Sequence, residues 1–242
     1  MDELQARVAR IALAACPDLD YALGGGLAVV AHGLIDRPTE DIDLFCTHSA
    51  VARTAAERIS AALEDDGLLV HVDIAVEDFA RLLVEIPDGG TVKLELVRDY
   101  RAHPPVRLDI GPVLHPDDAV ANKMGALFGR WYPRDYLDVD AALTRYSRSQ
   151  LLDLAAAHDP GFDLPHFRDA LAELNRLPDS AFTSYGISTA DLAAMRQRFA
   201  AWSNELSAPQ AGPERPPTAP IRRPTTRQPR PASETSREPP CF

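Results

Sequence analysis

The chain has few cysteines and no long apolar runs, and both shortages limit what the protein can be. Cys16, Cys46 and Cys241 are odd in number and fit no metal-ligand spacing, which predicts free thiols in a reducing compartment. No apolar run is long enough to cross a bilayer. The acidic start at Asp2 and Glu3 does not fit a signal peptide. We therefore expect a cytoplasmic protein with no membrane partner.

The charge is distributed unevenly along the chain. The formal net charge is −11, yet residues 208–242 contain six arginines and three glutamates and so carry +3, which leaves −14 on the remainder. An acidic body opposes broad, non-specific binding to nucleic acid, although it still allows a local basic groove. Ten of the last 35 residues are proline, so we expect a disordered tail over 208–242.

Apolar periodicity predicts an α+β protein. A small mixed sheet with flanking helices is expected over residues 1–115, and a helical C-terminal part over 116–207. Predicted strands cover 41–45, 68–76, 81–86, 91–97 and 106–110, with a turn at 87–90. Predicted helices cover 3–15, 26–34, 50–65, about 117–130, 133–146, 149–158, 166–176 and 189–206. Ser49 is a candidate N-cap of the third helix, and Asp117 or Asp118 of the fourth.

The most informative motif is a glycine turn followed by two carboxylates on one strand. Gly24-Gly25-Gly26 opens a short apolar helix, where backbone N–H groups and the positive helix end can approach a triphosphate. Asp41 and Asp43 are two apart on a strand and therefore point the same way. Such close charges repel each other unless a cation lies between them, and carboxylate oxygens suit Mg²⁺. The motif therefore indicates metal-assisted phosphoryl transfer.

A site with two metal ions usually needs a third carboxylate from a neighbouring strand. Three candidates lie between core-facing residues: Glu95, Asp73 and Asp109. We rank Glu95 first, because the strand after a hairpin turn can pair beside the strand that holds the metal. Asp73 ranks second, and each of the three can instead be an outward residue on a half-exposed strand.

Only two of the 25 basic residues are lysines, Lys93 and Lys123. For Lys93 a solvated strand face and a functional role are equally open. Lys123 and Arg130 are seven residues apart and share a helix face, and Asp135 and Asp138 share a face of the next helix. Cations above a metal site can neutralise the charge on leaving phosphates, while an aspartate orients the lysine or acts on the acceptor hydroxyl. Ordinary ion pairing on helix surfaces is the alternative.

These motifs resemble those of a known superfamily. The first resembles the polymerase-β-type nucleotidyltransferase signature, with Gly25-Gly26 followed by Arg37-x-Thr39-x-Asp41-Ile42-Asp43-Leu44. The second resembles the later motif of the AbiEii/AbiGii-type toxin nucleotidyltransferases, which include the MenT toxins: Lys123, Arg130 and Arg134-Asp135-x-x-Asp138. Together the two motifs span roughly residues 20–145.

The resemblance implies a nucleotidyltransferase core with a helical C-terminal part, and the use of a nucleoside triphosphate with Mg²⁺, held in a two-metal site. It also implies a cognate antitoxin, and as acceptor the 3′ end of tRNA. The implied metal ligands are Asp41 and Asp43, with Glu95 as a longer third carboxylate. Lys123 is implied to contact the triphosphate, and Asp135 or Asp138 to be the later essential aspartate. The residues implied to bind the nucleotide are Gly25, Gly26, Thr39, Lys123 and Arg130.

Two other functions remain open from the sequence. The acidic body favours a cationic small-molecule acceptor, as in antibiotic-modifying nucleotidyltransferases. Alternatively, the chain is a catalytically silent binding module that retains the fold. The intact pair of aspartates and Lys123 count against the silent module.

Overall fold

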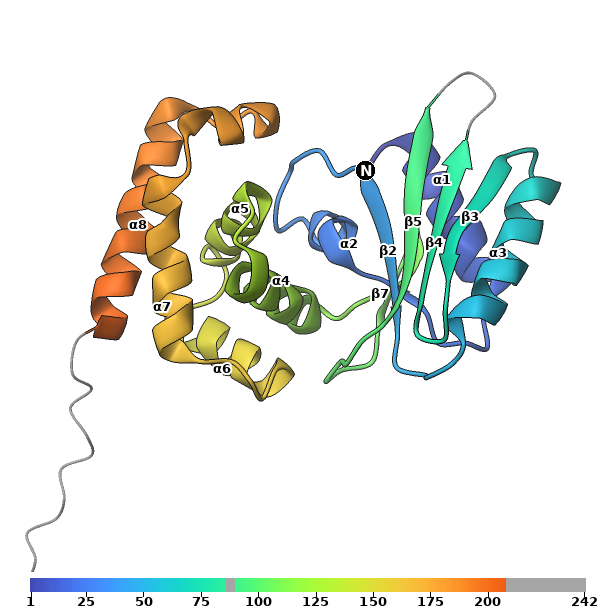
Figure 1. The fold of residues 1–242 in the computed structure, drawn as a ribbon, viewed down its shortest axis with the longest axis horizontal. Helices are drawn as coiled ribbons and strands as arrows, with labels where there is room; N and C mark the ends of the chain where they lie inside the picture. Colours follow the sequence, from blue (N-terminus) through green and yellow to red (C-terminus); the bar gives the residue numbers. More distant parts are fainter. Residues whose placement is uncertain (86–89, 208–242) are drawn as a thin grey trace, which may run out of the picture. The chain divides into compact units, whose positions relative to one another are not determined.

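A mixed sheet is the framework of the protein (Figure 1). The computed structural model describes residues 1–85 and 90–207, and within them the sheet has seven strands in the order β3-β4-β5-β2-β1-β7-β6. The strands are β1 (Ala22–Leu23), β2 (Asp41–Cys46), β3 (Leu69–Ala75), β4 (Phe79–Glu85), β5 (Thr91–Arg98), β6 (Val106–Leu108) and β7 (Gly111–Val113). The pairs β2–β5 and β1–β7 are parallel, and the other neighbours are antiparallel. The predicted α+β fold class is confirmed.

The two faces of the sheet differ in chemistry because successive residues alternate across a strand. Ile42, Leu44 and Cys46 of β2 are buried, as are Leu94 and Leu96 of β5. Helices α1 (Glu3–Ala15) and α3 (Ala52–Asp65) contact each other and cover this apolar face. The opposite face of the same strands is left with charged side chains.

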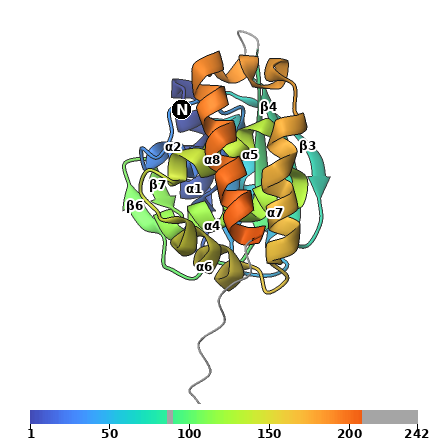
Figure 2. The same ribbon diagram turned by 90° about the vertical axis from the view of Figure 1, so that its left-hand side faces the viewer.

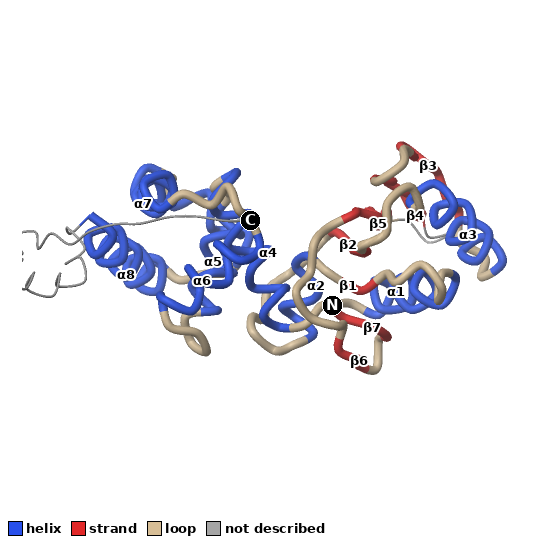
Figure 3. The backbone as a smooth tube through the Cα atoms, turned by 90° about the horizontal axis from the view of Figure 1, so that it is seen from below, coloured by secondary structure: helices blue, strands red, loops and turns tan. Residues whose placement is uncertain are grey.

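The remaining helices follow the sheet in sequence. They are α4 (Pro116–Arg130), α5 (Pro133–Ala142), α6 (Arg148–His158), α7 (Leu164–Glu173) and α8 (Thr189–Ser207), with 3₁₀ turns η1 (Leu174–Arg176) and η2 (Asp179–Tyr185). They gather apart from the strands (Figure 3), and α7 and α8 run side by side (Figure 2). Aromatic side chains fill their core, including Tyr136, Phe167 and Trp202. Helix α2 (Gly25–Ala31) contacts both β2 and α4, and so joins the two groups.

Two capping expectations were wrong. Val51, not Ser49, precedes α3, and no side chain caps that helix. At α4 the cap is His115, whose Nδ1 accepts the Asp117 N–H at 3.2 Å. Asp118 instead accepts backbone N–H bonds from Ala102 and His103, so a tertiary contact with the preceding loop takes its carboxylate.

Four short elements differ from the sequence prediction. The expected strand over 106–110 ends at Leu108 as β6, and a tight turn at 109–110 leads into β7, which was not predicted. Neither β1 nor η2 was predicted either, because such short segments do not show a periodic pattern.

Some expectations fall outside the described residues. They are the tail over 208–242 and most of the turn over 87–90. The described residues up to Ser207 belong to one compact unit, and the division at residue 115 stays a prediction. In the described ranges, no helix combines the length and the apolar character needed to cross a membrane.

Candidate active site

A polar cavity of about 470 Å³ lies over the charged face of the sheet. The sheet contributes Asp41, Asp43, Arg81, Lys93 and Glu95. The segment before β2 contributes Arg37, Pro38, Thr39 and Glu40, and α2 contributes Gly26. The helical part contributes Lys123, Arg130, Tyr132, Arg134, Ser184 and Tyr185. The cavity thus brings together most of the residues that the two sequence motifs singled out.

The register of two parallel strands assembles the acidic side chains. Asp43 lies opposite Glu95, and Asp41 lies opposite Lys93. The Lys93 ammonium is 3.1 Å from an Asp41 oxygen and 3.3 Å from a Glu95 oxygen. Arg81, opposite Glu95 on β4, places its Nε 2.8 Å from the same Glu95 oxygen. Three carboxylates and two cations therefore form one cluster at the base of the cavity.

The other two candidates for a third carboxylate lie elsewhere. Asp73 on β3 pairs with Arg81 at 3.6 Å and does not line the cavity. Asp109, exposed in the turn between β6 and β7, lines a different cavity. The structure therefore places Glu95, and neither Asp73 nor Asp109, beside Asp43.

The Asp43 carboxylate is the least compensated member of the cluster. Lys93 pairs with Asp41 and Glu95, and Lys123 pairs with Asp138. Among residues 1–85 and 90–207 no hydrogen bond or ion pair reaches the carboxylate oxygens of Asp43, and only its backbone oxygen accepts one, from Gly24. Loss of solvation raises the pKa of Asp43, and Lys123 only partly opposes the shift. A cluster of carboxylate oxygens with one uncompensated charge is a donor set that fits Mg²⁺.

The glycine turn is explained by close packing against β2 and the segment before it. Gly25 has φ +56°, and a Cβ added there would lie 1.7 Å from Asp43 Oδ2. A Cβ on Gly26 would lie 2.7 Å from Thr39 Cγ2. Within the described residues Thr39 Oγ1 is buried and has no hydrogen-bond partner. These short distances show that the turn brings α2 close to β2 and its carboxylates. Of the three glycines, only Gly26 lines the cavity.

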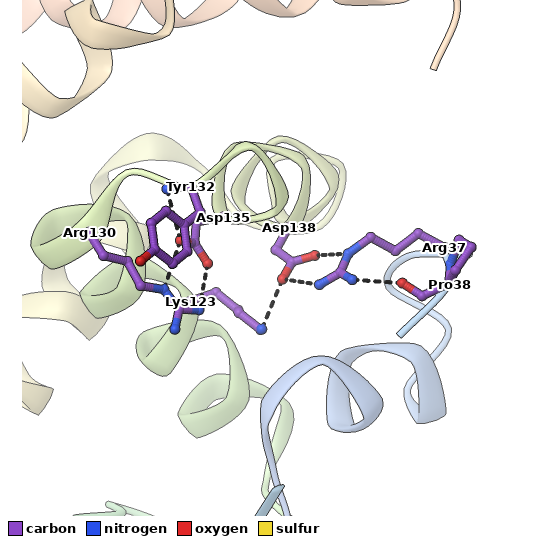
Figure 4. A network of polar contacts seen from close by, with 7 residues as sticks. All are labelled: Arg37, Pro38, Lys123, Arg130, Tyr132, Asp135 and Asp138. Atoms are coloured by element: carbon purple, nitrogen blue, oxygen red, sulfur yellow. Dashed lines mark hydrogen bonds and ion pairs between the residues drawn. The ribbon is translucent and has the colours of Figure 1, made fainter. Parts of the chain in front are cut away.

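Asp138 joins two basic residues from distant parts of the chain (Figure 4). Its fully buried carboxylate accepts hydrogen bonds from Arg37 Nε at 2.7 Å and Nη2 at 2.8 Å, and lies 2.9 Å from Lys123 Nζ. Burial would raise the pKa of Asp138, but Lys123 and Arg37 together hold it below the ordinary value. Asp138 is therefore ionised, both of its carboxylate oxygens are bonded to cations, and it orients Arg37 and Lys123.

Asp135 has a comparable position one turn earlier on α5 (Figure 4). Its buried carboxylate accepts two hydrogen bonds from Arg130, at 3.0 and 2.9 Å, and one from the backbone N–H of Tyr132 at 3.2 Å. It thus caps α5 and holds Arg130 beside the cavity. The guanidinium carbons of Arg130 and Arg134 lie 5.3 and 5.8 Å from the centre of the Tyr132 ring.

The sequence reasoning missed several residues of the cavity. Arg81 had a usable signal, because the turn predicted from the sequence at 87–90 implies that residues near 81 pair with residues near 95, as Arg81 and Glu95 do. Ser184 and Tyr185 had none, since η2 is short and far in sequence from both motifs.

A second polar cluster lies outside the cavity. The ligand atoms of His103, His115 and Asp117 are within 4.8 Å of one another. His115 Nδ1 accepts the Asp117 N–H, so the other ring nitrogen of a neutral His115 holds the proton and has no lone pair for a metal. The Tyr146 hydroxyl donates to Asp117 Oδ1 at 2.7 Å. These bonds give the cluster a structural role at the start of α4.

Comparison with solved structures identifies similar folds. A protein from H. pylori described as a nucleotidyltransferase has 18% identity and a TM-score of 0.54, and the match covers 85% of this chain and 99% of that one. JHP933 from Helicobacter pylori has 19% identity and a TM-score of 0.52, over 86% and 96% of the two chains. Among curated proteins no sequence matches this chain.

The family model of the nucleotidyl transferase AbiEii toxin, type IV toxin–antitoxin system, matches residues 12–201. That range includes the glycine turn, the strand aspartates and the later lysine and aspartates. The similarity expected from the two motifs is therefore confirmed. The chain belongs to the AbiEii toxin family and is a nucleotidyltransferase.

Proposed function

We propose that this enzyme transfers a nucleoside monophosphate from a nucleoside triphosphate to the 3′ end of tRNA, with Mg²⁺, as the toxin of a toxin–antitoxin pair. The observation that most supports this proposal is the cavity in which Asp41, Asp43 and Glu95 face Lys123 and Arg130. Family membership supports nucleotidyl transfer, an NTP substrate and a cognate antitoxin.

The acidic cluster is the proposed metal site. Asp41 and Asp43 would hold one ion, and Glu95 would join them in holding a second. When bound, these ions would supply activation of the acceptor hydroxyl and neutralisation of charge on the triphosphate. Both aspartates point into the cavity because residues two apart share a face of the strand, and this supports the assignment.

The helical side of the cavity supplies fixed positive charge. Lys123, oriented by Asp138, and Arg130, oriented by Asp135, face the position of the triphosphate and stabilise the pyrophosphate that leaves. Gly26 and Thr39 Oγ1 offer further contacts with phosphate. In this proposal Asp135 and Asp138 are positioning residues, because their oxygens are already bonded to cations.

The cavity is less acidic than the protein as a whole, which supports a nucleic acid acceptor. Six basic side chains and four carboxylates line it, and Asp135 and Asp138 behind them bring the local charges into balance, in a protein whose net charge is −11. A balanced cavity opposes a phosphate backbone less than the acidic body does. The exposed ring of Tyr132 also provides a surface on which an unpaired base can stack.

Transfer of label tests the proposal. Wild type, Asp43→Ala and Asp109→Ala are each incubated with Mg²⁺, one α-labelled NTP at a time, and total tRNA or aminoglycosides. We expect label on tRNA with wild type and with Asp109→Ala, which alters an exposed carboxylate outside the cavity, and a loss of at least about 100-fold with Asp43→Ala. Unchanged transfer by Asp43→Ala, or label on the drugs alone, would contradict the proposal.

A further inference from the structure

Lys93 occupies the gap between two of the three carboxylates. Its ammonium is 3.1 Å from Asp41 and 3.3 Å from Glu95, and its side chain is one-third exposed (33%). It is one of only two lysines among 25 basic residues. The sequence left its role open between a solvated strand face and a function, and these contacts exclude a merely solvated side chain.

The cluster has two spaces that could hold a metal ion, one between Asp41 and Glu95 and one beside Asp43, and they differ in whether a basic side chain already fills them. Between Asp41 and Glu95 there is already a cation, and Arg81 adds a second one on Glu95 at 2.8 Å. Asp43 has no such partner in the described part of the chain, and a divalent ion beside it relieves its repulsion from Asp41. In the absence of substrate, only the gap at Asp43 is ready for a metal ion.

Lysine is suited to a counter-ion that can be displaced. Its compact ammonium is carried on a flexible stem of four carbons, whereas the planar fork of arginine binds carboxylates in a fixed geometry. A nucleotide that brings its own divalent ion can push the ammonium out toward the open side of the cavity, where the β- and γ-phosphates offer new partners.

We propose that Lys93 is a built-in counter-ion of the second metal position, so that the nucleotide-free enzyme takes one divalent ion and the second enters only with nucleotide. This inference rests on the proposed function. Lys93 thereby keeps Asp41 and Glu95 compensated between turnovers, and makes assembly of the full site depend on substrate.

Counting bound Mn²⁺ tests the inference without any turnover. Nucleotide-free wild type, Lys93→Met and Lys93→Arg are each titrated with Mn²⁺, and electron paramagnetic resonance measures the free Mn²⁺. The same titration is repeated with Asp43→Asn added to each protein. The bound ions that disappear with Asp43→Asn are assigned to the site. We expect one such ion in wild type and in Lys93→Arg, and two in Lys93→Met. A non-hydrolysable triphosphate should raise the wild-type count to two, beyond the ion bound by free nucleotide.

The outcomes separate the two proposals. Equal counts in nucleotide-free wild type and Lys93→Met, whether one or two, would overturn the role of Lys93 and leave the proposed function in place. If no ion depends on Asp43 in any variant, with or without nucleotide, the metal site of the proposed function is wrong and the inference fails with it.

Discussion

Asp43 and Asp138 are two carboxylates within the same region that experience opposite environments. Asp138 is bonded to two cations, and its pKa is held below the ordinary value. The Asp43 carboxylate has no hydrogen-bond or ion-pair partner among the described residues, and burial raises its pKa. Folding therefore gains from the charge of Asp138 and is opposed by the charge of Asp43. Such uncompensated charge is typical of a position that awaits a ligand.

Replacing Asp43 should stabilise the metal-free protein. The raised pKa means that Asp43 favours folding most at pH values below 3.8, and that this contribution is lost as pH rises through its folded-state pKa. Asp43→Asn removes this buried, uncompensated charge and should therefore raise the free energy of unfolding at pH 7, with a smaller gain at pH 4. Urea unfolding in the presence of a chelator measures both values.

Asp41→Asn is the matched control for this prediction. Asp41 pairs with Lys93, so removing its charge also removes an ion pair and should give no comparable gain. A gain from Asp43→Asn that does not change between pH 4 and pH 7 would contradict the assigned cause.

The start of α2 shows how one element fits against another. Gly25 has a positive φ, and the space that a Cβ would need is filled by the Asp43 carboxylate. Gly24 precedes it as the N-cap, and its N–H donates to the backbone oxygen of Asp43 at 2.7 Å. The glycines are therefore required for the close approach of α2 to β2, independently of any bound phosphate.

Gly25→Ala should destabilise the protein by about 2 kcal/mol or more, because it combines backbone strain with a clash. Gly125→Ala is the control within a helix. Gly125 is in α4 with nothing within 4 Å of an added Cβ, so alanine there should stabilise by about 0.5–1 kcal/mol. Thermal unfolding of both variants checks the signs, and similar shifts at the two positions would contradict the packing argument.

For the molecule as a whole, Asp138 ties three separate segments together. It lies on α5, Lys123 lies on α4, and Arg37 precedes β2, 101 residues away in sequence. Removing one member of such a buried network leaves the other charges without compensation, which costs more than the intact network contributes. The network thus determines how the helices hold the cations over the sheet.

Asp138→Asn should lower the free energy of unfolding by about 3 kcal/mol at pH 7. Since the folded-state pKa of Asp138 is below 3.8, its contribution is complete above that pH and is lost as pH falls through the folded-state value. The acid-induced loss of stability should therefore be shallower in Asp138→Asn than in wild type, as measured by unfolding at a series of pH values.

Asp140→Asn on the same helix is the comparison for this network. Asp140 forms a more exposed pair with Arg198, so we expect Asp140→Asn to lower the free energy of unfolding by less than about 1 kcal/mol. Equal losses of unfolding free energy in Asp138→Asn and Asp140→Asn would contradict the prediction, because the buried network would then contribute no more than an exposed ion pair.

Local patterns in the chain were sufficient to predict most helices and strands, the shared face of Asp41 and Asp43, and Lys123 as a candidate residue of the site. Those features depend on residues within a few positions of one another, which periodicity and capping signals report. Only the tertiary structure decided four other features. They are the β2–β5 register that puts Glu95 beside Asp43, the ion pairs of Lys93 with Asp41 and Glu95, the Asp138 network, and the positions of Ser184 and Tyr185 at the cavity. They arise from contacts between segments tens of residues apart, and the energies of such contacts leave no periodic trace in the sequence.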